Sequence, residues 1–329
     1  MINTPRRIRI GTRGSALARW QAEHVAAALR SLPGSPEPEL VLIKTEGDII
    51  QDVPLSKVEG KAFFTKEIEE ALLTHQVDVA VHSLKDLATE MPPGLSLGAV
   101  LEREDPRDVL IFREGLSAGA LSPPPGGAEG RPEDLPRGAR LGTSSLRRRA
   151  FLKRWRPDLE LAELRGNVPT RIRKLDEGGY DAIVLAAAGV IRLGLAHRIS
   201  AFLPFGFFLP AVSQGAVGIQ IRSKDLDVAP WVEALEHPGT RVATTAERAL
   251  LRTMEGGCQV PVGALGELDE GRLRLRGAVC SLDGVRGVEG EISGPMEDAG
   301  ELGVSLAQRL IQEGADEILD EIRGGSVGG

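Results

Sequence analysis

Three segments of the sequence place arginine at the start of an expected helix. They read GTRGS at residues 11–15, GTSSLRRR at 142–149 and LRGNVPTR at 164–171. Arginine in a first helical turn opposes the positive end of the helix dipole, so this placement is unfavourable unless an anion binds there. Free backbone N–H groups and a planar guanidinium suit a carboxylate or a phosphate. Together the segments favour an acidic ligand, although each alone is equally well explained by pairing with surface acids.

A lysine and an aspartate follow an apolar run that reads as a strand. HSLKD at residues 82–86 comes directly after Val77 to Val81, so Lys85 and Asp86 are expected at the carboxyl end of that strand. In open α/β sheets this is the edge at which ligands bind. A carboxylate beside cationic groups suits the stabilisation of a developing cation or the acceptance of a proton. The alternative is a structural turn, which we favour for His82 and leave open for Asp86.

Cys258 lies in EGGCQVP at residues 255–261, just past an expected helix. The paired glycines permit positive φ and a tight, exposed loop, in which a ligand could reach the thiol. Most lone cysteines are instead small buried hydrophobes, and we expect this of Cys280 because it lies in an alternating strand. No His or Asp close to Cys258 in sequence suggests a peptidase pair.

Other common chemistries find little support. The five histidines are scattered, and HExxH, CxxC, Walker and GxGxxG motifs are absent from the sequence, so neither a metal nor a nucleotide is expected. The net charge of −7 argues against a general nucleic-acid binder. Residues 137–174, however, hold 12 Lys and Arg against 3 Asp and Glu, a local net charge of +9. This segment is either a solvated helix face or a confined site for a small polyanion.

Two stretches of alternating strands and helices can position these residues. The first predicts a mainly parallel sheet, with strands at 8–11, 39–44, 77–82 and 95–101 and helices at 15–32 and 65–75. After Asp105 the pattern restarts and predicts a second α/β domain, with strands at 108–112, 140–142, 159–164 and 181–186 and helices at 145–155 and from Pro169. Residues 115–138 are rich in Gly and Pro and read as a mobile loop insertion.

The last hundred residues change character. A β-like run at 209–221 precedes a helix at 247–255, antiparallel strands within 263–292 and a helical stretch at 301–323, which together predict a small α+β domain. The longest uncharged apolar stretches are much shorter than the roughly 20 residues that span a bilayer, and no signal region precedes the first strand. With two cysteines, the chain is expected to be cytoplasmic.

Eleven unusual motifs occur in the order found in the hydroxymethylbilane synthase (porphobilinogen deaminase) family, which the chain resembles from about Ile8 to Ile322. They are GTRGSALARWQ, TEGD, KAFFTKEIE, VDVAVHSLKD, EREDPRDV, GTSSLRRR, LRGNVPTR, YDAIVLAAAG, LPAVSQGAVGI, TAERALL and EGGCQVPVGA. The resemblance implies an α/β fold with two periplasmic-binding-protein-like domains around a cleft plus a small α+β C-terminal domain. Domain 1 would comprise 1–103 and 213–235, domain 2 104–212 and domain 3 236–329.

The resemblance also implies the chemistry. Porphobilinogen would lose ammonia to give an electrophilic azafulvene, which the free α-carbon of the growing chain attacks. Four such units would be joined head to tail into hydroxymethylbilane on a dipyrromethane cofactor held by a thioether to Cys258. Asp86 would be the catalytic carboxylate, assisted by Arg13. The family further implies a monomer that binds neither nucleic acid nor membrane.

Each porphobilinogen carries an acetate and a propionate, so the resemblance implies that the arginines bind these carboxylates. It assigns Ser15, Lys85, Ser145, Arg147, Arg148 and Arg165 to cofactor binding, and Arg13, Phe64, Arg171 and Arg192 to substrate binding. Some residues depart from the family pattern, among them Glu46, the loop at 59–63, Leu87 and Pro169. The main rival is a non-enzymatic binding protein of the same architecture, which would need the arginines but neither Asp86 nor Cys258.

Overall fold

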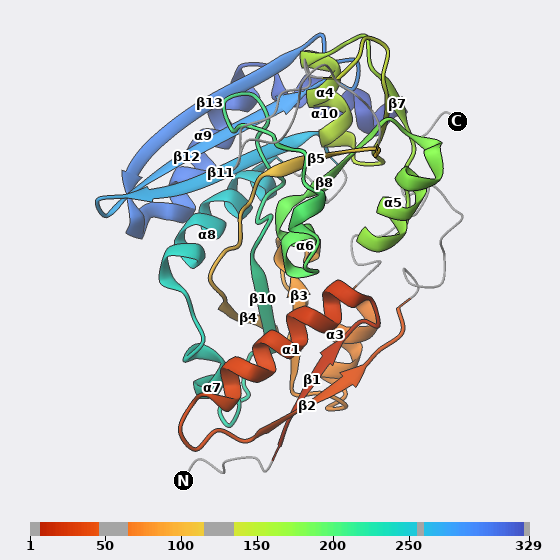
Figure 1. Ribbon diagram of the computed structural model, residues 1–329. Coiled ribbons are helices and arrows are strands. Elements are labelled where there is room, and N and C mark those ends of the chain that lie inside the picture. The colour runs from red at the N-terminus through yellow and green to blue at the C-terminus, as the bar shows by residue number, and fades with distance from the viewer. Residues whose placement is uncertain (1–6, 46–64, 115–134, 255–259, 326–329) are drawn as a thin grey trace. The chain divides into compact units, whose positions relative to one another are not determined.

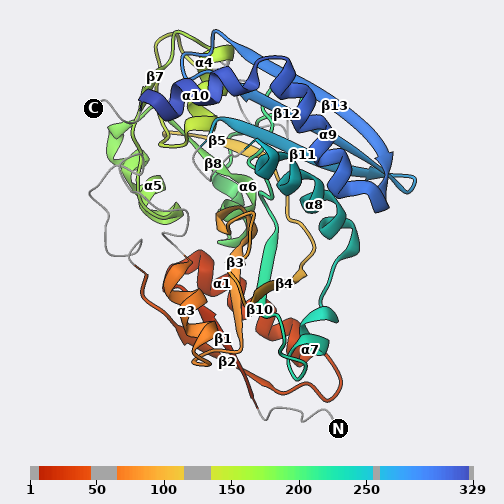
Figure 2. The same cartoon turned by 180° about the vertical axis from the view of Figure 1, so that it is seen from behind.

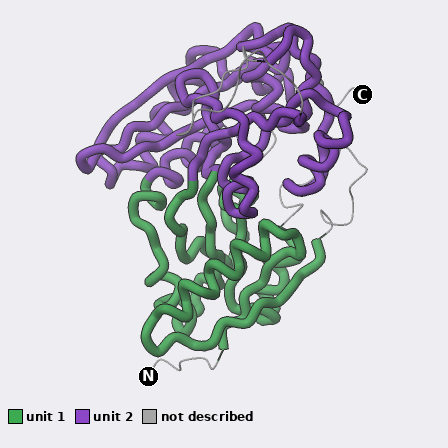
Figure 3. The backbone as a smooth tube through the Cα atoms, viewed as in Figure 1, with its two compact units in different colours: residues 1–104, 215–242 green, residues 105–214, 243–329 purple. Residues whose placement is uncertain are grey.

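The computed structural model describes residues 7–45, 65–114, 135–254 and 260–325, which fall into two compact units (Figure 3). Unit 1 comprises residues 1–104 and 215–242, and unit 2 comprises residues 105–214 and 243–329. The chain therefore passes from one unit to the other at 104/105, 214/215 and 242/243. The finer division into three domains stays a prediction.

A five-stranded sheet forms the centre of unit 1, in the order β2-β1-β3-β10-β4 (Figure 1). β1 pairs in parallel with β2 and β3, whereas β10 runs antiparallel to β3 and β4. Four strands thus run in one direction and β10 opposes them, so the sheet is mixed. Its strands are β1 (Arg7–Thr12), β2 (Glu37–Leu42), β3 (Val79–Ser83), β4 (Leu95–Val100) and β10 (Val217–Arg222).

Helices cover both faces of this sheet because its central strand is apolar on both sides. Val79 and Val81 of β3 pack with α1, whereas Ala80 packs with α3. Because successive side chains of a strand point to opposite faces, a strand that is buried on both faces has a continuous apolar sequence rather than an alternating apolar and polar one. The helical segments of unit 1 are α1 (Ala16–Arg30), α3 (Lys66–Leu73), α7 (Ala229–Glu233) and a 3-10 turn at Leu84–Asp86.

Unit 2 contains a second five-stranded sheet, in the order β7-β6-β8-β5-β9. β6 pairs in parallel with β7 and β8, and β5 runs antiparallel to β8 and β9. The strands are β5 (Asp108–Phe112), β6 (Arg140–Gly142), β7 (Glu160–Ala162), β8 (Ala182–Ala186) and β9 (Ala201–Phe202). The helices are α4 (Leu146–Trp155), α5 (Val168–Lys174) and α6 (Ala187–Arg192).

A three-stranded antiparallel sheet with helices completes unit 2 (Figure 2). On one face, a Cβ at Gly277 would lie 2.7 Å from Leu250 and 3.2 Å from Leu310, so a glycine is needed for the helices to approach. On the other face, Leu265 and Cys280 join the core around Phe151. The elements are β11 (Val262–Asp269), β12 (Arg272–Cys280), β13 (Gly287–Pro295), α9 (Ala299–Gln312), α10 (Ala315–Gly325) and α8 (Pro238–Thr253), whose residues up to 242 are counted with unit 1.

The α/β fold class is confirmed, with two mixed five-stranded sheets and a small C-terminal α+β part. The two five-stranded sheets share one strand order, in which the antiparallel strand lies between the third and fourth parallel strands. In each sheet that strand is the first after a passage between units: β5 follows 104/105 and β10 follows 214/215.

Three expectations about element boundaries were wrong by a wide margin. The helix expected at 247–255 already begins at Pro238. In the run at 209–221 only residues from Val217 onward form a strand, because Ser213 and Gly215 have φ of 63° and 89°, which a strand cannot contain. The helical stretch at 301–323 is two helices, since Gly314 at φ 101° ends the first.

Gly215 allows a close backbone approach at one passage between units. Its φ is 89°, and a Cβ there would lie 2.3 Å from the carbonyl oxygen of Glu104, which lies at another of the three passages. Gly215→Ala is therefore expected to lower the free energy of unfolding by more than about 1 kcal/mol, through positive-φ strain and backbone collision. Urea denaturation measures this. Gly14→Ala, with nothing within 4 Å of an added Cβ, is the control. A Gly215→Ala protein as stable as that control contradicts the account.

Candidate functional site

Three of the predicted site residues lie at one edge of the unit 1 sheet. Arg13 follows the carboxyl end of β1, and Lys85 and Asp86 form the 3-10 turn after β3. β1 and β3 are parallel neighbours, with Gly11 opposite Ala80, so their carboxyl ends lie side by side. All three side chains are half-buried. A cationic group and a carboxylate thus share the ligand-binding edge of this sheet.

Ser15 fixes the start of α1 beside this edge. Its Oγ accepts a hydrogen bond from the Ala18 backbone N–H at 3.3 Å, which makes Ser15 the N-cap of α1. Behind it, Gln21 is buried and its Nε2 donates to Ser83 Oγ at 2.9 Å. This bond ties α1 to the end of β3, two residues before Lys85. Sequence reasoning missed Gln21, although a polar residue on the apolar face of a helix requires a buried partner.

A buried polar group lies beneath the same edge. His82 is 6% exposed and points, like Ala80, to the α3 face of the sheet. Gln220 of β10 lies on that face and donates from Nε2 to Glu69 Oε1 at 3.1 Å. Burial lowers the pKa of His82 to about 4; a hydrogen bond with Gln220 raises this pKa, and the charge of Arg13 lowers it. The neutral imidazole fits the structural role favoured for His82.

This burial predicts a pH dependence of stability. Between about pH 6.5 and pH 4, histidine takes up a proton in the unfolded chain but not in the folded one. The free energy of unfolding should therefore fall as the pH is lowered through this window, by up to about 3 kcal/mol. Urea denaturation at several pH values should show that His82→Gln removes this part of the slope, whereas His197→Gln, at an exposed position, does not. Equal slopes in the wild type and His82→Gln would contradict the assignment.

The second cluster of predicted residues lies at the corresponding edge of the unit 2 sheet. Ser145 follows β6 and caps α4, its Oγ accepting from the Arg148 backbone N–H at 3.4 Å. Arg165 follows β7, and Arg192 ends α6, which follows β8 directly. Arg171 lies in α5, and its Nε donates to the Gly166 carbonyl at 2.7 Å. Arg165, Arg171 and Arg192 are all half-buried.

Arg147 and Arg148 differ from the other arginines because both are buried, at 3% and 5% exposure. Both bind the carboxylate of Asp108, the first residue of β5: Arg147 Nη2 donates to Oδ2 at 2.6 Å and Arg148 Nη2 to Oδ1 at 2.7 Å. Backbone carbonyls of Leu209 and Val184 accept from the remaining Nη1 groups. The two guanidiniums therefore have an internal anion, which the sequence analysis did not foresee.

Asp108 was missed although a signal was present. A carboxylate at the start of an apolar strand is costly to bury without cationic partners. In the structure it is 0% exposed, and Gln214 Nε2 also donates to its Oδ1 at 3.1 Å. Two buried guanidiniums against one carboxylate leave a local excess of one positive charge. Burial lowers the pKa of Arg147 while Asp108 raises it, but arginine stays protonated because its ordinary pKa is so high.

Another buried carboxylate binds the chain just before its passage from unit 2 to unit 1 at 214/215. Glu247 of α8 is 0% exposed, and its Oε2 accepts from the Ser213 N–H at 2.6 Å, while its Oε1 accepts from the Gly266 N–H at 2.8 Å. These bonds join residue 213 to β11 through one side chain of α8.

Two predicted residues, Cys258 and Phe64, lie outside the described residues, as do Glu46 and the loop at 59–63. Cys280 is 1% exposed, as expected of a small buried hydrophobe, and burial raises the pKa of its thiol. Within the described ranges no group of three or more His, Cys, Asp and Glu could hold a metal ion. Over the same residues, no helix is both long and apolar enough to cross a membrane.

Comparison with known proteins gives matches along almost the whole chain. Residues 8–230 match the family model "Porphobilinogen deaminase, dipyromethane cofactor binding domain", and residues 242–312 match "Porphobilinogen deaminase, C-terminal domain". Porphobilinogen deaminase of Geobacter metallireducens is 49% identical over 97% of this chain and 95% of that protein. The Syntrophomonas wolfei protein of the same name is 49% identical over 97% and 99%. Among solved structures, the VFT2 domain of Bordetella pertussis BvgS is similar at 14% identity and a TM-score of 0.42, over 70% of this chain and 86% of that one.

Proposed function

We propose how individual residues carry out the reaction of this chain, which belongs to the porphobilinogen deaminase family. The chain is a transferase of tetrapyrrole biosynthesis that joins four porphobilinogen molecules into hydroxymethylbilane with release of ammonia, on a dipyrromethane cofactor. The observation that carries the assignment of residues is that Arg13 and the Lys85–Asp86 turn follow neighbouring parallel strands, at the carboxyl edge of one sheet. That edge provides both a carboxylate and the cations that an acidic substrate requires.

The residues of unit 2 fit a cofactor that bears several carboxylates. The Asp108 cluster holds two guanidiniums against one carboxylate, and the buried Nε of Arg147 has no hydrogen-bond partner within the part of the chain that the structure describes. An excess of buried positive charge is stabilised by an added anion. When bound, the dipyrromethane supplies the free pyrrole carbon at which the chain is lengthened. Its carboxylates would be held by Ser145, Arg147, Arg148 and Arg165, and from unit 1 by Ser15 and Lys85.

Asp86 is the proposed catalytic carboxylate. Its oxygens can accept the proton of a pyrrole N–H and stabilise the positive charge that develops on that nitrogen as ammonia leaves. This interaction strengthens as the charge grows, so it lowers the barrier more than it favours substrate binding. Arg13, beside it, is proposed to bind a substrate carboxylate and to assist catalysis. Arg171 and Arg192 are proposed to bind further carboxylates of the substrate or the lengthening chain, with Phe64 against the pyrrole rings.

Cys258 is proposed as the point of cofactor attachment, and the protein is proposed to be a cytoplasmic monomer. The buried free thiol of Cys280 supports a reducing compartment, since a disulfide framework is not expected with two cysteines. Determination of the native mass at micromolar concentration tests whether the protein is a monomer.

The mass of the denatured protein tests the attachment. Protein expressed in cells that make porphobilinogen is expected to weigh more than its sequence by two linked pyrrole units. Cys258→Ser should lose this addition, and Cys280→Ser, the matched control, should keep it. An unmodified wild-type mass would favour the rival hypothesis of a binding protein, and an addition retained in Cys258→Ser would place the cofactor elsewhere.

A further inference from the structure

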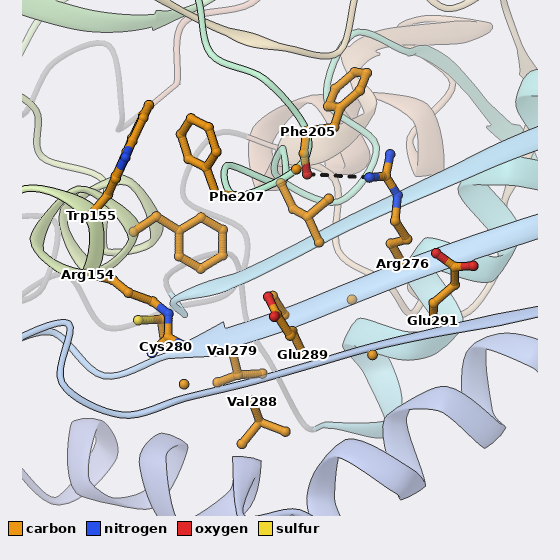
Figure 4. Close-up of a pocket in the computed structure, with 17 residues that line it drawn as sticks. Arg154, Trp155, Phe205, Phe207, Arg276, Val279, Cys280, Val288, Glu289 and Glu291 are labelled. Atoms are coloured by element: carbon orange, nitrogen blue, oxygen red, sulfur yellow. Dashed lines mark hydrogen bonds between the residues drawn. The ribbon is translucent and has the colours of Figure 1, made fainter. Parts of the chain in front are cut away.

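A cavity within unit 2 has no part in the function proposed above. Its volume of about 410 Å³ is in the range of small-molecule pockets. α4 and residues 205–209 line one side, and β12 and β13 line the other (Figure 4). All of these segments belong to unit 2. The lining is mostly apolar with a few charged groups, which is the usual composition of a ligand site.

Aromatic side chains form one wall of the cavity. They are Phe151, Trp155, Phe205 and Phe207, a third of the 12 aromatic residues of the chain. The ring centroids of Trp155 and Phe207 lie 3.4 Å apart, and Phe207 remains 38% exposed. In a chain with so few aromatic residues, this concentration beside an open cavity offers a surface against which a flat ring can pack.

Charged residues of β12 and β13 form the opposite wall. In the strand register Glu291 is opposite Arg276, Glu289 opposite Ala278 and Gly287 opposite Cys280, so these pairs project from one face of the sheet. Figure 4 shows Glu289 and Glu291 on the cavity side, whereas Val279 and Val288 point away.

Two of the charges in the cavity are already neutralised. Arg276 Nη2 donates to Glu267 at 2.8 Å, and Glu291 accepts from Arg274 at 2.5 Å. Two others have no ion-pair partner among the residues that the structure describes. Arg154 hydrogen-bonds the Cys280 thiol, and Glu289, like Arg154, is an exposed side chain.

The positions of Arg154 and Glu289 limit which ligands can bind both side chains in the cavity. A Cβ at Gly287 would lie 2.7 Å from Arg154 Nη1, so the glycine makes room for this guanidinium against the strand. Glu289 is two residues further along β13, a distance of about 7 Å between backbone positions. A molecule with a carboxylate and an ammonium group on one carbon can reach both side chains.

We propose that this cavity binds a flat heteroaromatic amino acid. The ring packs against the aromatic wall, the ammonium group binds Glu289 and the carboxylate binds Arg154. A hydrophobic ring contact together with two charge-assisted hydrogen bonds distinguishes such a ligand from a plain carboxylate or amine. The site is additional to the proposed function and does not depend on it.

Binding can be observed directly at the cavity wall by fluorine NMR. Protein labelled with 5-fluorotryptophan has three tryptophan positions, 20, 155 and 231, and Trp155→Phe identifies the resonance of Trp155. Three probes are titrated: L-tryptophan, tryptamine, which lacks the carboxylate, and indole-3-propionate, which lacks the ammonium group. L-tryptophan is expected to shift the Trp155 resonance saturably. The other two should bind at least about tenfold more weakly, because each loses one charge-assisted hydrogen bond.

Variants assign the two charged contacts. Glu289→Gln should weaken L-tryptophan binding and leave indole-3-propionate unchanged, and Arg154→Gln should weaken L-tryptophan binding and leave tryptamine unchanged. Glu313→Gln, at an exposed position between α9 and α10, should change neither. No shift with L-tryptophan, or equal affinity for all three probes, would overturn the proposal. Conversion of porphobilinogen by the same samples reports the proposed function separately, so failure of one is distinguishable from failure of the other.

Discussion

Asp86→Asn is expected to lower kcat by at least about 100-fold, the lower end of the effect of a positioned acid or base. Asparagine has nearly the same shape as aspartate but carries no negative charge, so it can neither accept a proton from a pyrrole nitrogen nor stabilise positive charge there. Ground-state binding depends mainly on the arginines, so KM should change much less than kcat. Steady-state measurement of hydroxymethylbilane formation gives both constants.

The matched control for this substitution is Glu90→Gln, which removes an exposed carboxylate four residues further along the chain. It should leave kcat within about twofold of the wild type, because surface charges contribute little. Circular dichroism and thermal unfolding of Asp86→Asn should match the wild type, since the Asp86 side chain is only half-buried. If kcat of Asp86→Asn stayed near normal in a folded protein, Asp86 would lose its assigned role.

Asp108→Asn is expected to lower the free energy of unfolding by about 3–5 kcal/mol. The substitution leaves two buried guanidiniums without a buried counter-charge, and asparagine can accept only part of the hydrogen bonds that the carboxylate accepts from Arg147 and Arg148. The two adjacent guanidinium groups then repel each other in a region of low dielectric constant. Urea denaturation of purified protein measures the loss.

Glu177→Gln is the control for this second prediction. Its partner Arg173 lies one helical turn away, and both side chains are more than half exposed, so the loss should be below about 0.5 kcal/mol. The same Asp108→Asn protein should contain less dipyrromethane, as measured by mass, because Arg147 and Arg148, which are proposed to hold its carboxylates, are displaced. A loss of stability below about 1 kcal/mol would mean that the Asp108 cluster is not the buried network described here.

The sequence predicted where side chains lie along the sheet better than it predicted their partners. Lys85 and Asp86 were expected at the carboxyl end of a strand because a lysine and an aspartate follow an apolar run, a signal confined to ten residues, and they form the turn after β3. The bond of Asp108 to Arg147 and Arg148 joins positions about 40 residues apart, and local patterns contain no information on such pairing. An acidic ligand for the arginines stays a prediction, and for Arg147 and Arg148 the structure shows an anion that is a side chain of the chain itself.

The same distinction applies to the fold. Helix and strand types followed from apolar periodicity, and β5 and β6 agree in both bounds with the expectation. The direction of β10 could not be read from its sequence, because a buried strand has the same apolar run in parallel and antiparallel sheets. The shortened strand after residue 209 depends on the positive φ of Ser213, a conformation that a serine rarely adopts.

The place of β10 in the unit 1 sheet has a consequence for biosynthesis. β10 lies between β3 and β4, so neither of these strands is fully paired before residues 217–222 leave the ribosome. The sheet of unit 2, from residue 108 to residue 202, is complete earlier, because all its strands are contiguous in the chain. The unit 1 sheet therefore remains incomplete during translation while the unit 2 sheet closes first, which reverses the usual order of cotranslational folding.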